Sequence, residues 1–166
     1  MTNFPEISRR MLAECEGKEG IERHLCTMVA LRGDTDGKSF DAFILKHGRR
    51  FVVDADSYIG SLPAKQCYGN AAMTAINEGL TYVEGYTTVC GLPIQHAWNI
   101  SKDGKVRDYT LDNDDAKYGG REFFGVPFKT EFLRRTVLKK GTFQLFDWME
   151  PKFVIDGDAA KKVKKL

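Results

Sequence analysis

The sequence lacks the features that mark membrane and secreted proteins. No apolar run approaches the roughly 20 residues needed to cross a bilayer, and the N-terminus does not show the basic and apolar regions of a secretory signal. Charge of one sign is also missing, because 25 basic and 23 acidic residues leave a formal charge of +2. We therefore expect a cytoplasmic protein with no membrane partner. The balanced charge gives no reason to expect a nucleic-acid partner.

Cysteine is scarce, and its spacing does not suggest a disulfide framework. The four cysteines, Cys15, Cys26, Cys67 and Cys90, are irregularly spaced. Without a visible secretory signal, reduced thiols are the expectation. A zinc site formed by Cys15, His24 and Cys26 is a weaker alternative, because their spacing matches no paired-ligand pattern.

Internal repeats, a dinucleotide-binding glycine fingerprint and a phosphate-binding loop are absent as well. What remains is typical of one globular domain spanning 1–166, since 166 residues with 42% apolar and 29% charged content can bury a core. We expect that core over 51–148. The lysine-rich tail over 156–166 is expected to be frayed and solvated rather than to bind nucleic acid.

The hydrophobic pattern predicts an α+β fold with a helix packed on an antiparallel sheet. Apolar residues three and four positions apart predict helices, whereas alternating apolar residues predict strands. In the last helix, Thr130 is the expected cap, Leu138 faces inward and Gly141 ends the helix. The expected helices cover 6–16, 67–78 and 130–139, and the expected strands cover 26–32, 39–46, 51–53, 80–86, 94–100, 105–111 and 142–148.

Cys67, His96 and Asp108 occur in an order that fits a thiol-dependent acyl-transfer site. Cys67 falls at the start of the predicted helix, where unpaired backbone N–H groups and the helix dipole should lower its pKa. A nucleophilic cysteine also needs a proton acceptor with an orienting partner. We assign these roles to His96 and Asp108.

The register of the predicted 94–100/105–111 hairpin decides whether this site can form. A three-residue loop with Gly104 left-handed would pair Trp98 with Asp108 and bring His96 within side-chain reach of that carboxylate. A two-residue turn would instead place His96 and Asp108 on opposite faces of the hairpin. The catalytic hypothesis therefore requires the first register.

The segment from Gln66 to Thr110 resembles the core of the transglutaminase-like superfamily, a branch of the papain-like cysteine fold. The resemblance rests on the cysteine at the head of a helix, the Tyr-Val-Glu-Gly-Tyr segment at 82–86, His-Ala-Trp at 96–98 and Asp-Tyr-Thr at 108–110. It implies the catalytic roles given above. Two departures are the short interval between the histidine and the aspartate, and Tyr68, where relatives frequently carry tryptophan.

Four further residues are candidates for the cleft or the oxyanion site. Besides the Cys67 backbone N–H, Gln66 could stabilise an oxyanion or be an ordinary loop residue. Asn70 could line the site or support the first helical turn. Tyr82 could border the cleft or belong to the core, and Trp98 could shield the His–Asp pair or simply pack.

The leading hypothesis is a cysteine-dependent hydrolase or acyltransferase that acts on a protein, peptide or small amide. It would function as a protease, amidase, deamidase or transglutaminase and would need no cofactor. One alternative is a catalytically inert binding or inhibitory protein that keeps the fold. A third reading is a metal-dependent hydrolase with Cys67, His96 and Asp108 as ligands.

Overall fold

The computed structural model describes residues 4–34, 37–112, 120–147, 152–153 and 162–165. They form an α+β fold with a curled antiparallel sheet in the strand order β1-β5-β2-β3-β4 and a small β6-β7 pair. The helices are α1 (Phe4–Ala13), α2 (Gly20–Arg32), α3 (Phe40–His47), α4 (Cys67–Glu78) and α5 (Thr130–Lys140). The strands are β1 (Arg49–Arg50), β2 (Thr81–Val89), β3 (Leu92–Ile100), β4 (Val106–Arg107), β5 (Phe123–Pro127), β6 (Phe146–Asp147) and β7 (Lys152–Phe153).

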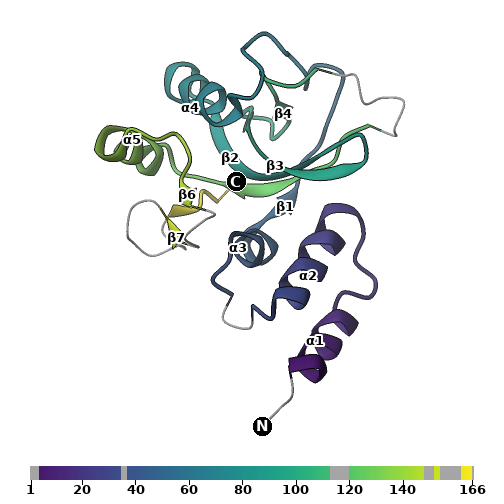
Figure 1. Ribbon diagram of the computed structural model, residues 1–166. Coiled ribbons are helices and arrows are strands. Elements are labelled where there is room, and N and C mark those ends of the chain that lie inside the picture. Colours follow the sequence, from purple (N-terminus) through teal and green to yellow (C-terminus); the bar gives the residue numbers. More distant parts are fainter. Residues whose placement is uncertain (1–3, 35–36, 113–119, 148–151, 154–161, 166) are drawn as a thin grey trace.

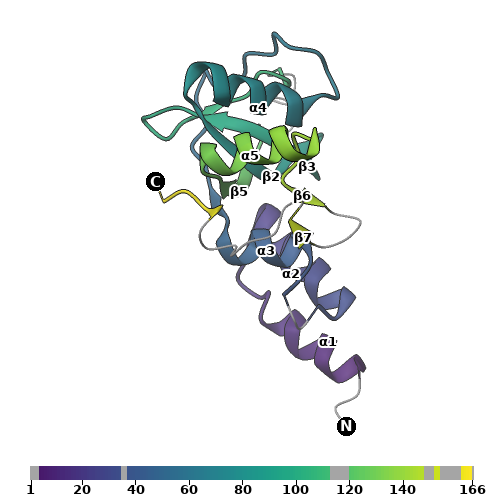
Figure 2. The same cartoon turned by 90° about the vertical axis from the view of Figure 1, so that its left-hand side faces the viewer.

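Two apolar clusters lie on opposite faces of the sheet. The larger one joins the sheet to α2, α3, α4 and α5 and contains Leu25, Phe43 and Leu133. The smaller one surrounds Trp98 and Phe123. Helices α1 to α3 group together at one end of the molecule, with α1 farthest from the sheet, and α4 lies at the other end (Figures 1 and 2).

The predicted strands at 26–32 and 39–46 are wrong, because both segments are helical. In α2, buried Ile21, Leu25 and Val29 recur every four residues, so the helical period is visible only when the segment is read from residue 20. In α3, the Ser39 side chain accepts a hydrogen bond from the backbone N–H of Ala42 at 3.1 Å. That bond caps the helix, and the mixed apolar run that follows is buried by helix packing rather than in a sheet.

The expectation that all four cysteines are reduced is also wrong. Cys15, which follows α1, forms a disulfide with Cys26 in α2, and their Cα atoms are 5.7 Å apart. The bond fastens α1 to α2. It also removes both thiols from the zinc site considered with His24, because disulfide sulfurs are not thiolate ligands. Cys67 and Cys90 are outside the disulfide.

The helix beginning at Cys67 and the strand after it are confirmed. Helix α4 ends at Gly79, whose φ of 71° is the left-handed conformation expected of a helix stop. Strand β2 then runs on to Val89, because Cys90 and Gly91 form a two-residue turn with φ of 50° and 77°. Positive φ at both positions suits the tight hairpin that leads into β3.

The C-terminal third differs from expectation in several details. Lys129, not Thr130, precedes helix α5, whose N-terminus has no side-chain cap. Leu138 is 85% exposed rather than inward, whereas Gly141 ends the helix as predicted. Of the predicted strand 142–148 only β6 forms, and Trp148 lies outside the described residues. The predicted strand 51–53 reduces to a bridge at Val52 next to β1.

The described end of the basic tail is packed, not frayed. Val163 forms a bridge with Phe128, and the backbone N–H of Lys164 donates to the carbonyl of Pro127 at 2.8 Å. Lys162 is buried, with its ammonium 5.1 Å from the centre of the Phe132 ring. Residues 154–161, which include most of the predicted tail, lie outside the described residues.

Candidate active site

The β3–β4 hairpin adopts the register that the catalytic hypothesis requires. Ser101 donates its backbone N–H to the carbonyl of Lys105 at 3.0 Å, and Gly104 has a φ of 81°. Strand pairing continues from this three-residue loop to Asn99 opposite Arg107. His96 and Asp108 consequently face one another, with 2.7 Å between His96 Nε2 and Asp108 Oδ2.

Asp108 is fully buried and held by an array of backbone groups. Its Oδ1 accepts hydrogen bonds from the N–H groups of Thr110 at 2.9 Å and Leu111 at 3.0 Å. Its own backbone N–H donates to Ser57, and its carbonyl accepts from Ile59, both at 2.7 Å. The loop before α4 therefore fixes the position of the carboxylate, a role that its polar sequence did not reveal.

His96 is enclosed by aromatic rings. It is 2% exposed, and its ring lies nearly parallel to that of Trp98, with 6.2 Å between centroids and 14° between planes. The Phe123 ring lies 6.4 Å away. Trp98 is thus a residue of the smaller core cluster that stacks on His96, and its role as a shield of the His–Asp pair stays a prediction.

The charges around His96 favour its protonated form. Burial alone would lower its pKa, but the hydrogen bonds to Asp108 and Cys67 outweigh burial and raise the pKa to about 9. Because Nε2 contacts Asp108, Nδ1 is the ring nitrogen left for the sulfur of Cys67. The imidazole therefore lies between the thiol and the carboxylate, as a proton relay requires.

Cys67 is the first residue of α4 and is half-buried. Burial raises the pKa of its thiol, but the hydrogen bond and positive charge of His96, together with the backbone N–H groups of Ala97 and Tyr68, lower it below the ordinary value. Sulfur, imidazole and carboxylate thus come together from a helix start, from strand β3 and from the residue after strand β4. This arrangement supports a thiolate–imidazolium pair.

Asn70 does not act on the sulfur but braces the Asp108 side of the site. Its side-chain amide donates to the carbonyl of Pro63 at 2.8 Å and to Thr110 Oγ1 at 2.9 Å. Gln66 precedes α4, is exposed and makes no side-chain cap. The first N–H groups of the helix therefore have no capping side chain; that of Tyr68 contacts the sulfur, and the positive end of the helix dipole favours a negatively charged oxygen here.

Tyr82 belongs to the core rather than to an open cleft. It is 1% exposed, and its hydroxyl lies 2.8 Å from Glu84 Oε1 and 2.9 Å from the carbonyl of Phe143. Glu84 is fully buried and also accepts a hydrogen bond from the N–H of Leu145 at 2.5 Å. Burial raises its pKa to about 7 against the lowering effect of these donors.

Sequence interpretation missed Glu84 as part of this network. The available signal was a carboxylate in the middle of a strand that has no other charged residue. A second missed pair is Tyr86 and Asp41, whose side chains form a buried hydrogen bond. Arg32 contacts the same carboxylate at 2.5 Å, which ties α2 and α3 to β2.

The described residues offer no grouping of three or more His, Cys, Asp or Glu side chains that could hold a metal ion. Both imidazole nitrogens of His96 have partners, in Asp108 and Cys67, and the metal-hydrolase reading stays untested. In the described part of the chain, no helix has the length and apolar character needed to cross a bilayer.

Comparisons with known proteins add no family assignment. No protein-family model matches the sequence, and no curated protein or solved structure is detectably similar to the chain.

Proposed function

We propose that the protein is a cysteine-dependent acyl-transfer enzyme with a papain-like, transglutaminase-like core. The observation that carries the proposal is the buried His96–Asp108 hydrogen bond beside Cys67, whose pKa lies below the ordinary thiol value. A thiolate is the nucleophile in this chemistry, and a lowered pKa increases the share of the sulfur that is ionised at a given pH. The substrate is a protein, peptide or small amide.

In the proposed first step, the Cys67 thiolate attacks the carbonyl carbon of the substrate. The uncapped N–H groups at the start of α4 stabilise the resulting oxyanion, with Gln66 as a further candidate donor. The His96 imidazolium donates its proton to the leaving nitrogen, the carbon–nitrogen bond breaks, and a thioester to Cys67 remains.

In the second step, water or an amine attacks the thioester. Neutral His96 accepts a proton from this nucleophile as the carbon–sulfur bond breaks, which restores the thiolate–imidazolium pair. Asp108 holds the imidazole in one orientation throughout, because its other oxygen is fixed by two backbone N–H groups. No metal ion or organic cofactor takes part in these steps.

Selective alkylation tests the proposal, with Cys90 as an internal control. Cys90 is the exposed cysteine of the β2–β3 turn, and Cys67 is half-buried. Treatment with limiting iodoacetamide at slightly acidic pH, followed by peptide mass spectrometry, should label Cys67 faster than Cys90. Cys67→Ser should remove the fast label, and Cys90→Ser should leave it unchanged. Slower labelling of Cys67 than of Cys90 would instead favour a catalytically inert protein.

The cytoplasmic location stays a prediction, and one observation counts against it. Disulfides are rare in the reducing cytosol of most organisms, and the chain contains the Cys15–Cys26 disulfide. Trapping free thiols by alkylation during extraction from cells would decide whether this bond is present there.

A further inference from the structure

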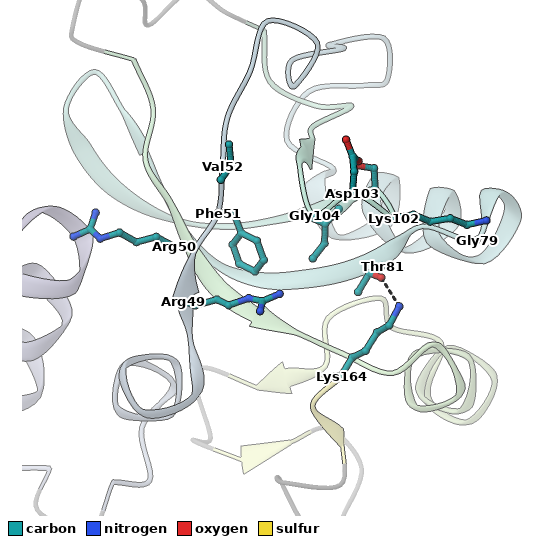
Figure 3. A pocket seen from close by; sticks show the side chains of 12 residues that line it. Arg49, Arg50, Phe51, Val52, Gly79, Thr81, Lys102, Asp103, Gly104 and Lys164 are labelled. Carbon is teal, nitrogen blue, oxygen red and sulfur yellow. Dashed lines mark hydrogen bonds between the residues drawn. The ribbon is translucent and has the colours of Figure 1, made fainter. Parts of the chain in front are cut away.

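A pocket of about 600 Å³ lies at the end of α4 opposite to Cys67. It is bounded by β1 and the residues after it, by the β3–β4 turn and by the C-terminal segment (Figure 3). Gly79, at the end of α4, is one of its lining residues. A helix of this length places Gly79 about 18 Å from Cys67, so the pocket is separate from the proposed catalytic site.

Three cations line this pocket without a carboxylate partner among the described residues: Arg49, Lys102 and Lys164. Lys164 Nζ donates to the neutral hydroxyl of Thr81 at 2.7 Å. The Arg49 guanidinium lies 5.1 Å from the centre of the Phe51 ring. Figure 3 shows the Arg49 and Lys164 side chains extending into the same hollow from different segments.

The other charged residues of the pocket are already paired. Arg50 binds Glu122 at 2.7 Å, and Asp103 faces Lys105 at 3.8 Å and hydrogen-bonds Ser101. The pocket therefore carries an excess of positive charge. Bringing like charges together is unfavourable, and a bound anion would offset the repulsion.

Apolar surface lies beside these cations. Val52 is 66% exposed, and the Phe51 ring lies at the centre of the view in Figure 3. We propose that the pocket binds a small organic anion whose phosphate or carboxylate groups contact Arg49 and Lys164 and whose flat apolar part covers Phe51 and Val52. An arginine fork suits either oxyanion, and the pocket volume is typical of small-molecule sites.

Isothermal titration calorimetry of the full chain tests this site with three probes: tripolyphosphate, citrate and adenosine triphosphate. We expect saturable binding with one site per chain. The stronger of the first two probes identifies the preferred oxyanion. Adenosine triphosphate should bind more tightly than tripolyphosphate, because its adenine can cover the apolar surface, and Val52→Ser should remove that advantage.

Matched variants test whether the anion binds in this pocket or is attracted to basic surface residues in general. Arg49→Gln and Lys164→Gln should each weaken binding about tenfold, the usual effect of losing one charge-assisted hydrogen bond. Lys139→Gln, at an exposed position of helix α5 and outside the pocket, should change affinity less than twofold. Circular dichroism confirms that each variant is folded.

Two outcomes would refute the proposed binding site: no saturable binding of any probe, or an equal loss of affinity in the Lys139→Gln and Arg49→Gln variants. Equal affinity for adenosine triphosphate and tripolyphosphate, unchanged by Val52→Ser, would refute the apolar part of the proposal. Cys67→Ser should bind all probes normally, so failure of the pocket and failure of the catalytic proposal are distinguishable.

Discussion

Replacing Glu84 by glutamine should change how the stability of the protein depends on pH. The Glu84 carboxyl is fully buried, and burial raises its pKa from 4.5 to about 7. Between these two values the folded protein keeps a proton that the unfolded chain has released. Stability must then fall as the pH rises, since deprotonation favours the unfolded state.

The size of the effect follows from the shift. Each pH unit in this interval costs about 1.4 kcal/mol of unfolding free energy, so the whole interval costs about 3 kcal/mol. The contribution of Glu84 is fully present below pH 4.5 and is lost as the pH passes about 7. The side chain of the Glu84→Gln variant does not ionise, yet its carbonyl could still accept the hydrogen bond from Leu145.

Urea unfolding followed by tryptophan fluorescence, without reductant, measures this difference. The free energies of the wild type and Glu84→Gln should diverge by about 3 kcal/mol between pH 4.5 and pH 7, with the variant gaining relative to the wild type. Glu16→Gln, at an exposed position, serves as the matched control. Parallel pH curves for the wild type and Glu84→Gln would refute the reasoning.

Three more predictions concern the triad and its brace. His96→Asn should move the pH midpoint of Cys67 alkylation upward, because burial then acts on the thiol without a compensating positive charge. Asp108→Asn should lower the His96 titration midpoint, measured by NMR, from about 9, whereas an unchanged midpoint would remove Asp108 from the relay. Asn70→Ala should destabilise the fold by about 1–3 kcal/mol in urea unfolding, because two partly buried hydrogen bonds lose their donor. Asn77→Ala, at an exposed position of the same helix, should lower the unfolding free energy by less. Equal losses in the two variants would show that the Asn70 hydrogen bonds do not stabilise this part of the site.

The parts of the site that the sequence predicted are those set by local rules. A helix start at Cys67 follows from its flanking residues. Left-handed Gly104 suits both the two-residue and the three-residue loop that the sequence left open, and the structure has the three-residue loop. That loop fixes the register, and the register alone decides that His96 meets Asp108. Each of these steps depends on neighbours in the chain, which a pattern can show.

The parts that the sequence did not predict depend on contacts between distant segments. The role of Asn70 becomes visible only when Thr110 is beside it, and the disulfide depends on how α1 packs on α2. The helices α2 and α3 were read as strands because short apolar runs suit either structure until packing decides. Glu84 was missed for the same reason, since its partner Leu145 lies 61 residues away along the chain.

The early end of β4 makes the candidate site possible. Hydrogen-bonded pairs alternate along an antiparallel ladder, so after Ser101 with Lys105 and Asn99 with Arg107 the next pair would join Ala97 to Tyr109. Strand β4 stops at Arg107, and the loop before α4 takes over, with the N–H of Leu62 donating to Tyr109 at 2.9 Å. The N–H of Ala97 is thereby left for the sulfur of Cys67. A longer β4 would keep the His–Asp pair, but its backbone would accept the hydrogen bond from the N–H of Ala97 that now goes to the Cys67 sulfur. The proposed chemistry therefore requires a short β4.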